Sequence, residues 1–152
     1  MNESEYKKRE IATGIDLGIR SEKLITDDIS QMLSVEPTLG YQKGHSYIGR
    51  EKANSRIIEV RRTRAFGVWH FCTSQFMESD NLDELAQFLI VKFNNAKEAI
   101  HKLLENPDYS VIISIWYVGE GRFCIKSDLL AQLASMCEEV CITTWEQDEV
   151  VD

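Results

Sequence analysis

The stretch YSVIISIWYV, residues 109–118, constrains the fold more than any other part of this chain, because nearly every side chain in it is apolar. A strand with one face in water alternates between apolar and polar residues, whereas a strand covered on both faces is apolar almost throughout. We therefore expect residues 109–118 to form a central strand of a sheet, and the rest of the chain to supply its neighbours and its cover.

The neighbouring strands are indicated by shorter apolar segments. We expect strands over residues 11–20, 66–73 and 140–145, and residues 56–62 could form a short edge strand as well. Residues 11–20 alternate with the period of a half-buried strand. After the central strand, Gly119-Glu120-Gly121 predicts a tight turn, so residues 122–126 are expected to return as the second strand of a hairpin.

The longest helical pattern runs from residue 82 to residue 103, where apolar side chains recur at spacings of three and four. Its stripe consists of Leu82, Leu85, Leu89, Phe93, Ala96, Ile100 and Leu103. We expect Ser79 or Asp80 to cap this helix, and Asn106-Pro107 to end it.

Two shorter helices complete the pattern. One is expected after an N-cap at Thr26 and before Pro37, and the other over residues 128–136 after an N-cap at Ser127. The element order becomes β-α-β-α-β-β-α-β within a single domain, residues 1–152. We expect an α+β fold: a two-layer sandwich with a mixed, mostly antiparallel sheet and helices on one face.

Composition indicates a cytoplasmic protein without a membrane segment. The longest apolar runs are about five residues, against the ~20 that a membrane helix needs. The N-terminal residues are charged and no apolar run follows them, unlike a signal peptide. Four cysteines lack the spacing of a disulfide framework, so we interpret them as buried free thiols in a reducing compartment: Cys72, Cys124, Cys137 and Cys141.

The sequence shows no motif for catalysis or for a cofactor. His45, His70 and His101 are far apart in the chain, and no pair has metal-ligand spacing. His70 and Cys72 would share a strand face, but about 7 Å along a strand is long for an activating hydrogen bond. We expect no metal, no cofactor and no enzymatic activity.

Charge is unevenly distributed along the chain. Residues 41–64 hold seven of the 17 Lys and Arg residues against two Glu residues, so this basic excursion carries +5 and the remainder −13 of the net −8. The excursion could be a solvated loop with salt bridges to the acidic body. It could also bind an anion, with Lys43, Arg61, Arg62 and Trp69 as candidate residues, or dock a partner. We expect no nucleic-acid binding, because the acidic body would repel phosphates.

The acidic remainder is a second candidate binding surface. An acidic face steers a basic partner toward a protein and speeds association. The candidate docking residues lie around the last strand and in the acidic tail, residues 146–152: Glu138, Glu139, Glu146, Asp148 and Glu149. The alternative is that this charge serves solubility alone.

Four stretches in a fixed order carry a family resemblance: LITDDISQMLSVEPTLGYQKGHSY, FGVWHFCT, NLDELAQFLIVKF and VIISIWYVGEGRFCIKSDLLAQLASMCEEVCITTW. Together they resemble the bacterial family called domain of unknown function 4279, over about residues 12–145. The positions that match its pattern are Pro37, Thr38, Lys43, Gly44, Trp69, Gly121, Ser127, Leu129, Leu130, Leu133 and Trp145. One departure is the stretch between Gly44 and Phe66, which is longer and more basic than the pattern.

The resemblance implies no catalytic residue. Small acidic bacterial proteins of this kind resemble the immunity proteins of toxin systems, which bind and block a cognate toxin domain. We therefore expect a non-enzymatic protein-binding module, a monomer or weak dimer, whose partner could be a basic toxin domain. The alternative is a regulatory domain that binds a small anion or metabolite.

Overall fold

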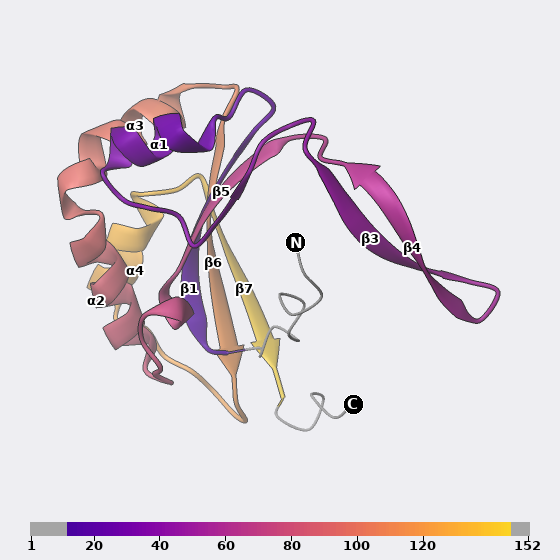
Figure 1. Cartoon of the computed structure of the whole chain (residues 1–152). Coiled ribbons are helices and arrows are strands. Elements are labelled where there is room, and N and C mark those ends of the chain that lie inside the picture. Colours follow the sequence, from indigo (N-terminus) through magenta and orange to yellow (C-terminus); the bar gives the residue numbers. More distant parts are fainter. Residues whose placement is uncertain (1–11, 147–152) are drawn as a thin grey trace.

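The computed structural model describes residues 12–146, which form two layers and a projecting arm (Figure 1). The strands are β1 (Gly14–Ser21), β2 (Leu39–Tyr41), β3 (Ser46–Ala53), β4 (Arg56–Thr63), β5 (Gly67–Cys72), β6 (Ser110–Val118) and β7 (Glu139–Trp145). The helices are α1 (Thr26–Leu33), α2 (Leu82–Lys92), α3 (Lys97–Glu105) and α4 (Ser127–Ala134), with 3-10 turns η2 (Thr73–Gln75) and η3 (Asn94–Ala96).

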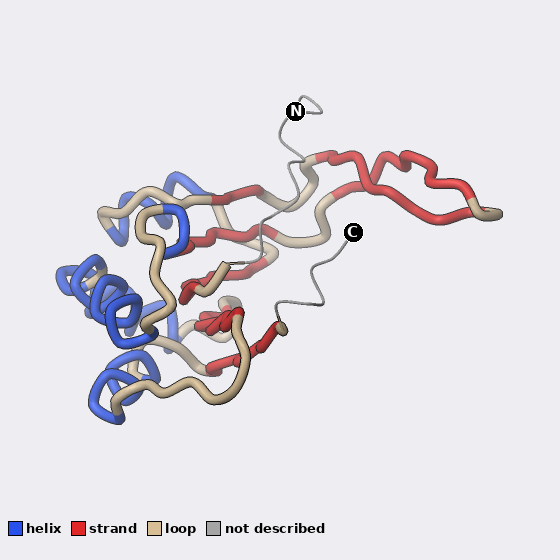
Figure 2. The backbone as a smooth tube through the Cα atoms, turned by 90° about the horizontal axis from the view of Figure 1, so that it is seen from below, coloured by secondary structure: helices blue, strands red, loops and turns tan. Residues whose placement is uncertain are grey.

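The larger sheet has the strand order β2-β5-β1-β6-β7, and the four α-helices of the described chain cover one of its faces (Figures 1 and 2). β1 pairs antiparallel with both β5 and β6, β2 pairs antiparallel with β5, and β7 pairs parallel with β6. The predicted α+β class with a mixed, mostly antiparallel sheet is confirmed. β6 is an interior strand as predicted, although the middle position belongs to β1.

The predicted hairpin after β6 is wrong. Residues 119–126 form a loop that leads to α4, and the neighbour of β6 is β7, in register from Ile112↔Glu139 to Val118↔Trp145. Parallel strands need a crossover connection, and α4 supplies it. Gly121 does turn the chain, with φ +82°, but the turn leads into the helix layer.

The core lies between the sheet and the helices. Alternate residues of the interior strands are fully buried on the helix side: Ile15, Leu17 and Ile19 on β1, Trp69 and Phe71 on β5, and Val111, Ile113 and Ile115 on β6. They meet the buried stripe of the helices, which includes Leu85, Leu89, Phe93, Ile100, Leu103 and Leu133. Because strand side chains alternate, the remaining residues of these strands face the other way.

The predicted long helix is two helices. α2 ends at Lys92 and α3 begins at Lys97, with the turn η3 between them. Asn94 and Asn95 are poor helix formers, which favours a break here. Phe93, just before the turn, and Ala96, its last residue, are both buried, so the apolar stripe continues across the break. The spacing of apolar residues therefore gave no sign of the interruption.

The predicted N-caps are also wrong. Asn81 caps α2, and its side chain accepts hydrogen bonds from the backbone N–H of Asp83 and Glu84. Thr26 and Ser127 are the first residues inside α1 and α4 rather than the residues before them. An N-cap and the first helical residue favour similar small polar side chains, so the sequence placed these starts one residue late.

Trp69 is buried at 0% exposure, and its indole N–H donates to the hydroxyl of Ser30 on α1 at 3.0 Å. The interaction ties α1 to the sheet within the core. A second buried hydroxyl, that of Thr73, accepts from the backbone N–H of Ile15 at 2.9 Å, where β5 ends beside β1. Buried polar groups are stabilising only when they are paired in this way.

None of the four cysteines forms a disulfide, but their burial differs from the prediction. Cys137 is buried, Cys72 and Cys141 are half-buried and Cys124 is exposed. Cys124 lies in the loop that was predicted to be a strand, which explains its exposure. Among the described residues, no helix is long and apolar enough to cross a membrane.

β3 and β4 form a sheet of their own, the arm, which leaves the body beside β2 and β5 and extends away from the helices (Figure 2). At its base the backbone of Arg64 bonds to Gly44 and His45: Gly44 N–H donates to Arg64 O at 2.9 Å, and Arg64 N–H donates to His45 O at 2.8 Å. Every residue of the arm, residues 46–63, is exposed or half-buried. The core is thus built without the arm.

We predict that the body folds without the arm. Replacing residues 46–63 by Asn-Gly joins two residues that are already hydrogen bonded, His45 and Arg64. The free energy of unfolding should change by less than about 1 kcal/mol, because no core contact is lost and the shorter loop costs less closure entropy. Thermal unfolding followed by circular dichroism measures this. Loss of the cooperative transition would show that the arm is part of the folding unit.

We predict that Ser30→Ala destabilises the protein by about 1–3 kcal/mol, because the buried indole N–H of Trp69 loses its acceptor. The higher helix propensity of Ala offsets about half a kcal/mol of that loss. The matched control is Ser74→Ala at an exposed position, with an expected change within about 0.5 kcal/mol. Urea denaturation compares the two variants, and equal stabilities would rule out a structural role for this hydrogen bond.

Candidate functional site

The basic segment of the sequence is the arm and its base. β3 and β4 pair antiparallel from Ser46↔Thr63 to Ala53↔Arg56. The turn between them is Asn54-Ser55, and both residues have positive φ, 49° and 65°. Positive φ at both central residues is the requirement of a type I′ turn, the tight connection that suits two twisted strands. The segment predicted as a short edge strand, residues 56–62, is therefore one half of a separate hairpin.

On one face of the arm, an arginine and a glutamate pair across the two strands, and Ile58 on the same face is 42% exposed. Tyr47, Gly49, Glu51 and Arg62 share this face, because residues paired across the hairpin point the same way. Arg62 forms an ion pair with Glu51. Its side chain lies against Gly49, where an added Cβ would approach Arg62 Cδ and Nε to 3.2 Å. The glycine thus gives Arg62 room to reach across the strand.

The opposite face, which we call the open face, combines apolar and basic side chains. Ile57 is 74% exposed and Ile48 is 50% exposed. The same face carries Arg50, Lys52, Glu59 and Arg61, and the pair Ser46 and Thr63 at its base. Apolar and Arg side chains in this arrangement are typical of protein contact surfaces, where they act as anchors. A loop that served only as a solvated excursion would not need the isoleucines.

The base of the arm is held by aromatic rings. The Arg64 guanidinium lies 3.9 Å from the ring centroid of Tyr41 and 3.7 Å from that of Tyr47. Each cation–π contact at an exposed site stabilises by about 0.5–1 kcal/mol. Tyr41 ends β2 and Tyr47 lies near the start of β3, so Arg64 links the arm to the edge of the large sheet.

The residues predicted for an anion site do not converge. Lys43 lies in the turn before the arm, with its ammonium 3.4 Å from Glu22 Oε2. Arg61 and Arg62 point to opposite faces of the arm, and Trp69 is buried in the core. These four described side chains therefore do not line a common site. The structure gives the anion-binding alternative no geometric support.

The predicted acidic residues are separated by the length of a strand. Glu138 and Glu139 lie at the start of β7 and Glu146 follows its end, a span of about 23 Å. Asp148 and Glu149 lie outside the described residues. Glu139 also accepts a hydrogen bond from the Cys141 thiol at 3.2 Å, and this interaction raises the pKa of Cys141. The described candidates thus form a pair at the start of β7 and a single residue after its end instead of one cluster.

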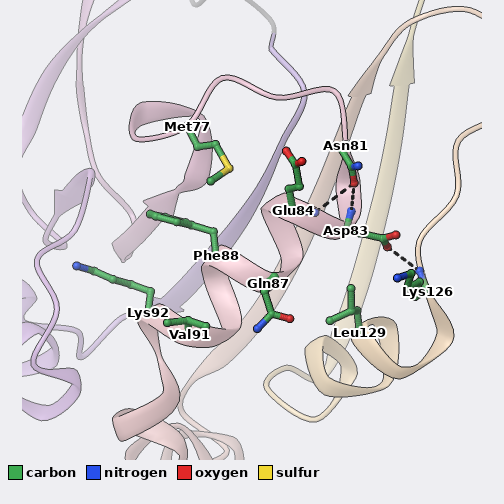
Figure 3. Close-up of a pocket in the computed structure, with 10 residues that line it drawn as sticks. All are labelled: Met77, Asn81, Asp83, Glu84, Gln87, Phe88, Val91, Lys92, Lys126 and Leu129. Carbon is green, nitrogen blue, oxygen red and sulfur yellow. Dashed lines mark hydrogen bonds between the residues drawn. The ribbon is translucent and has the colours of Figure 1, made fainter.

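A shallow depression of about 700 Å³ lies between α2 and the start of α4 (Figure 3). Its lining consists of Met77, Asn81, Asp83, Glu84, Gln87, Phe88, Val91, Lys92, Lys126 and Leu129. Two of its charged groups serve the fold: Asp83 accepts from the backbone N–H of Lys126 at 2.8 Å, and Glu84 accepts from the Ser79 hydroxyl at 2.9 Å. The sequence gave no signal for this depression, because it joins helices that are distant in the chain.

A polar trio that the sequence reasoning missed lies on the sheet face opposite the helices. The side chains of Asp16, His70 and Cys72 are half-buried, and their donor atoms all lie within 4.8 Å of one another. The sequence places His70 and Cys72 on one strand face, but it gives no sign of Asp16 beside them. The missing information was the pairing of β1 with β5, which puts Asp16 directly opposite Cys72.

Comparison with known proteins identifies a family but no characterised relative. A family described as Domain of unknown function (DUF4279) matches residues 10–145. No curated protein and no solved structure was found to match the chain.

Proposed function

We propose that this chain, which belongs to the DUF4279 family, is a non-enzymatic protein-binding module whose contact element is the β3–β4 arm. The observation that supports the proposal most directly is the open face of the arm, with Ile57 74% exposed among basic side chains. The body holds the arm away from the helix layer (Figure 2). A projecting arm of this kind can enter a groove in another protein.

The physics of an isolated hairpin supports a binding role. Two strands without a third strand or a helix against them are marginally stable in water. Each strand of the arm also has an outer edge that no described strand covers, and such edges readily pair with another chain. Charged side chains, here mostly basic, reduce unwanted pairing at exposed edges. A partner that packs against the arm or pairs with its edges would supply the stabilising contacts that an isolated hairpin lacks.

Charge indicates what kind of surface the arm fits. Residues 41–64 carry +5, so the groove that receives the arm should be lined with carboxylates. The remainder of the chain carries −13 and would attract a basic surface. A basic toxin domain with an acidic catalytic cleft satisfies both requirements, for example a nuclease that binds Mg²⁺ through carboxylates. We therefore propose an immunity protein that blocks such a cleft with its arm.

The same charges also allow a second copy of this chain as the partner, with the basic arm of one copy against the acidic body of another. A weak dimer of this kind would compete with the toxin for the open face. Analytical ultracentrifugation of the full chain and of the arm-less variant separates the two cases, because only arm-dependent dimerisation disappears with residues 46–63.

We predict that Ile48→Ser with Ile57→Ser weakens binding to the cognate toxin domain by at least about tenfold, since exposed apolar anchors are lost. The domain to test first is the C-terminal domain of the protein encoded directly upstream in the source genome. Val91→Ser is the matched control, because Val91 is 63% exposed on α2, away from the arm. Calorimetric titration measures the dissociation constants. If the wild type, the double isoleucine variant and the Val91→Ser control bind the toxin domain with equal affinity, the arm is excluded as the contact element.

We predict that charge acts mainly on the association rate. Lys52→Glu with Arg61→Glu should slow association about tenfold at low salt, and added salt should reduce the difference. The control is Arg122→Glu, an exposed position in the loop after β6. Glu138→Gln with Glu139→Gln tests steering by the body in the same stopped-flow experiment. If the arm variant associates as fast as the wild type at every salt concentration, the proposed acidic groove is wrong.

A further inference from the structure

We propose that Asp16, His70 and Cys72 form a binding site for a divalent transition-metal ion, with Zn²⁺ as the first candidate. Their donor atoms all lie within 4.8 Å of one another, and all three side chains are half-buried. The site lies on the face of the large sheet that the helices leave uncovered. It is independent of the arm and of the function proposed above.

The pairing of β1 with β5 builds the site. Asp16 lies directly opposite Cys72, and Gly18 lies opposite His70. Side chains alternate along a strand, so residues 16 and 18 and residues 70 and 72 point to the same face. The site thus combines one carboxylate from the middle strand of the sheet with an imidazole and a thiol from its neighbour. Sites on strands are held more rigidly than sites on loops.

Gly18 makes room for the imidazole of His70. A Cβ added at Gly18 would lie 2.6 Å from His70 Nε2 and 2.8 Å from His70 Cδ2, closer than real Cβ atoms come to other atoms. The His70 ring therefore lies against the bare backbone of β1, on the side where Asp16 projects. A glycine inside a strand weakens it, and close approach of another group is a common reason for its presence.

Thr38 fixes the backbone of both β5 residues. Its hydroxyl accepts from the backbone N–H of Cys72 at 3.1 Å and donates to the backbone carbonyl of His70 at 3.2 Å. Its own backbone N–H donates to the same carbonyl at 2.8 Å. The segment before β2 thus clamps the strand at the two residues that would supply nitrogen and sulfur. Groups that position ligands in this way strengthen metal binding.

The donor set matches a borderline divalent ion. A thiolate, an imidazole and a carboxylate are all ligands of Zn²⁺, with bond lengths of about 2.0–2.3 Å. Around a tetrahedral Zn²⁺ the donor atoms lie about 3.3–3.8 Å apart, so shifts of about 1 Å in the side chains suffice to close the trio around the ion. Three protein ligands leave the fourth position for water or another ligand.

The thiol of Cys72 is not part of a disulfide, and neither are the other three cysteines. Cys72 pairs with Asp16, Asp16 with Ser114, and Ser114 with Cys141 across four adjacent strands. Cys141 is therefore three strand spacings from Cys72, or about 14 Å. That separation excludes a disulfide between the two. Binding of the ion would release the thiol proton of Cys72, so the affinity should increase with pH.

The test is a titration of the tag-free, metal-free full chain with Co²⁺, followed by competition with Zn²⁺. We expect one Co²⁺ per chain and a near-ultraviolet absorption from thiolate-to-cobalt charge transfer, which Zn²⁺ removes. Cys72→Ser should abolish this absorption, and Asp16→Asn or His70→Gln should weaken binding at least about tenfold. Cys141→Ser is the matched thiol control and should bind as the wild type does.

Positioning is tested with Gly18→Ala and Thr38→Val, which keep all three ligands. Each should weaken Co²⁺ binding by about tenfold while the charge-transfer absorption persists at saturation. The thermal midpoint of each metal-free variant shows whether it folds. If Cys72→Ser does not fold, a second measurement on the wild type takes the place of this variant. Bound Zn²⁺ should slow the alkylation of Cys72 by a thiol reagent, and the exposed Cys124 is the internal control.

The proposal is overturned if the wild type binds no Co²⁺ at equimolar concentrations, or if the thiolate absorption survives Cys72→Ser. It is also overturned if Zn²⁺ fails to slow alkylation of Cys72. Rapid alkylation of Cys72 that depends on His70 but not on metal would instead point to a nucleophilic thiol.

Discussion

The pairing of β1 with a neighbour on each side is the constraint on which the rest of the structure depends. β5 and β6 both align antiparallel to it, and their registers divide every side chain of the three strands between two faces. Ile15, Leu17 and Ile19 enter the core, and Asp16 and Gly18 face away from it. A shift of one residue would exchange the faces, burying a carboxylate and exposing the apolar set. The loss of apolar burial in the shifted pairing is large, so the observed register is the only stable one.

Local patterns in the sequence were sufficient for the fold class, because period-two and period-3.6 burial are properties of single segments. They predicted β1, β5, β6 and the apolar stripe of α2 and α3. They failed where the outcome depended on distant partners. Gly119 and Gly121 suit a hairpin turn, yet β6 pairs with β7, which lies beyond α4. The break at η3 was hidden because Phe93 and Ala96 keep the stripe continuous.

The candidate sites show the same division. The basic character of residues 41–64 was visible in the sequence, but the assignment of Ile57 and Arg61 to one face and of Arg62 to the other required the register of the hairpin. Trp69 was a candidate for anion binding, but its burial at 0% exposure places it in the core. The trio on the sheet face opposite the helices could not be predicted, since Asp16 and Cys72 are neighbours only across a pair of strands.

The closed base of the arm has a consequence for how such a protein can change over time. His45 and Arg64 are hydrogen bonded where the arm begins. The two ends of the arm therefore keep the same positions relative to the large sheet, whatever residues lie between them. A hairpin can lengthen or shorten by one residue on each strand without moving β2 or β5. Selection for a new partner can therefore change the arm's length, tip and open face, while the core of the body and its sheet face opposite the helices stay the same.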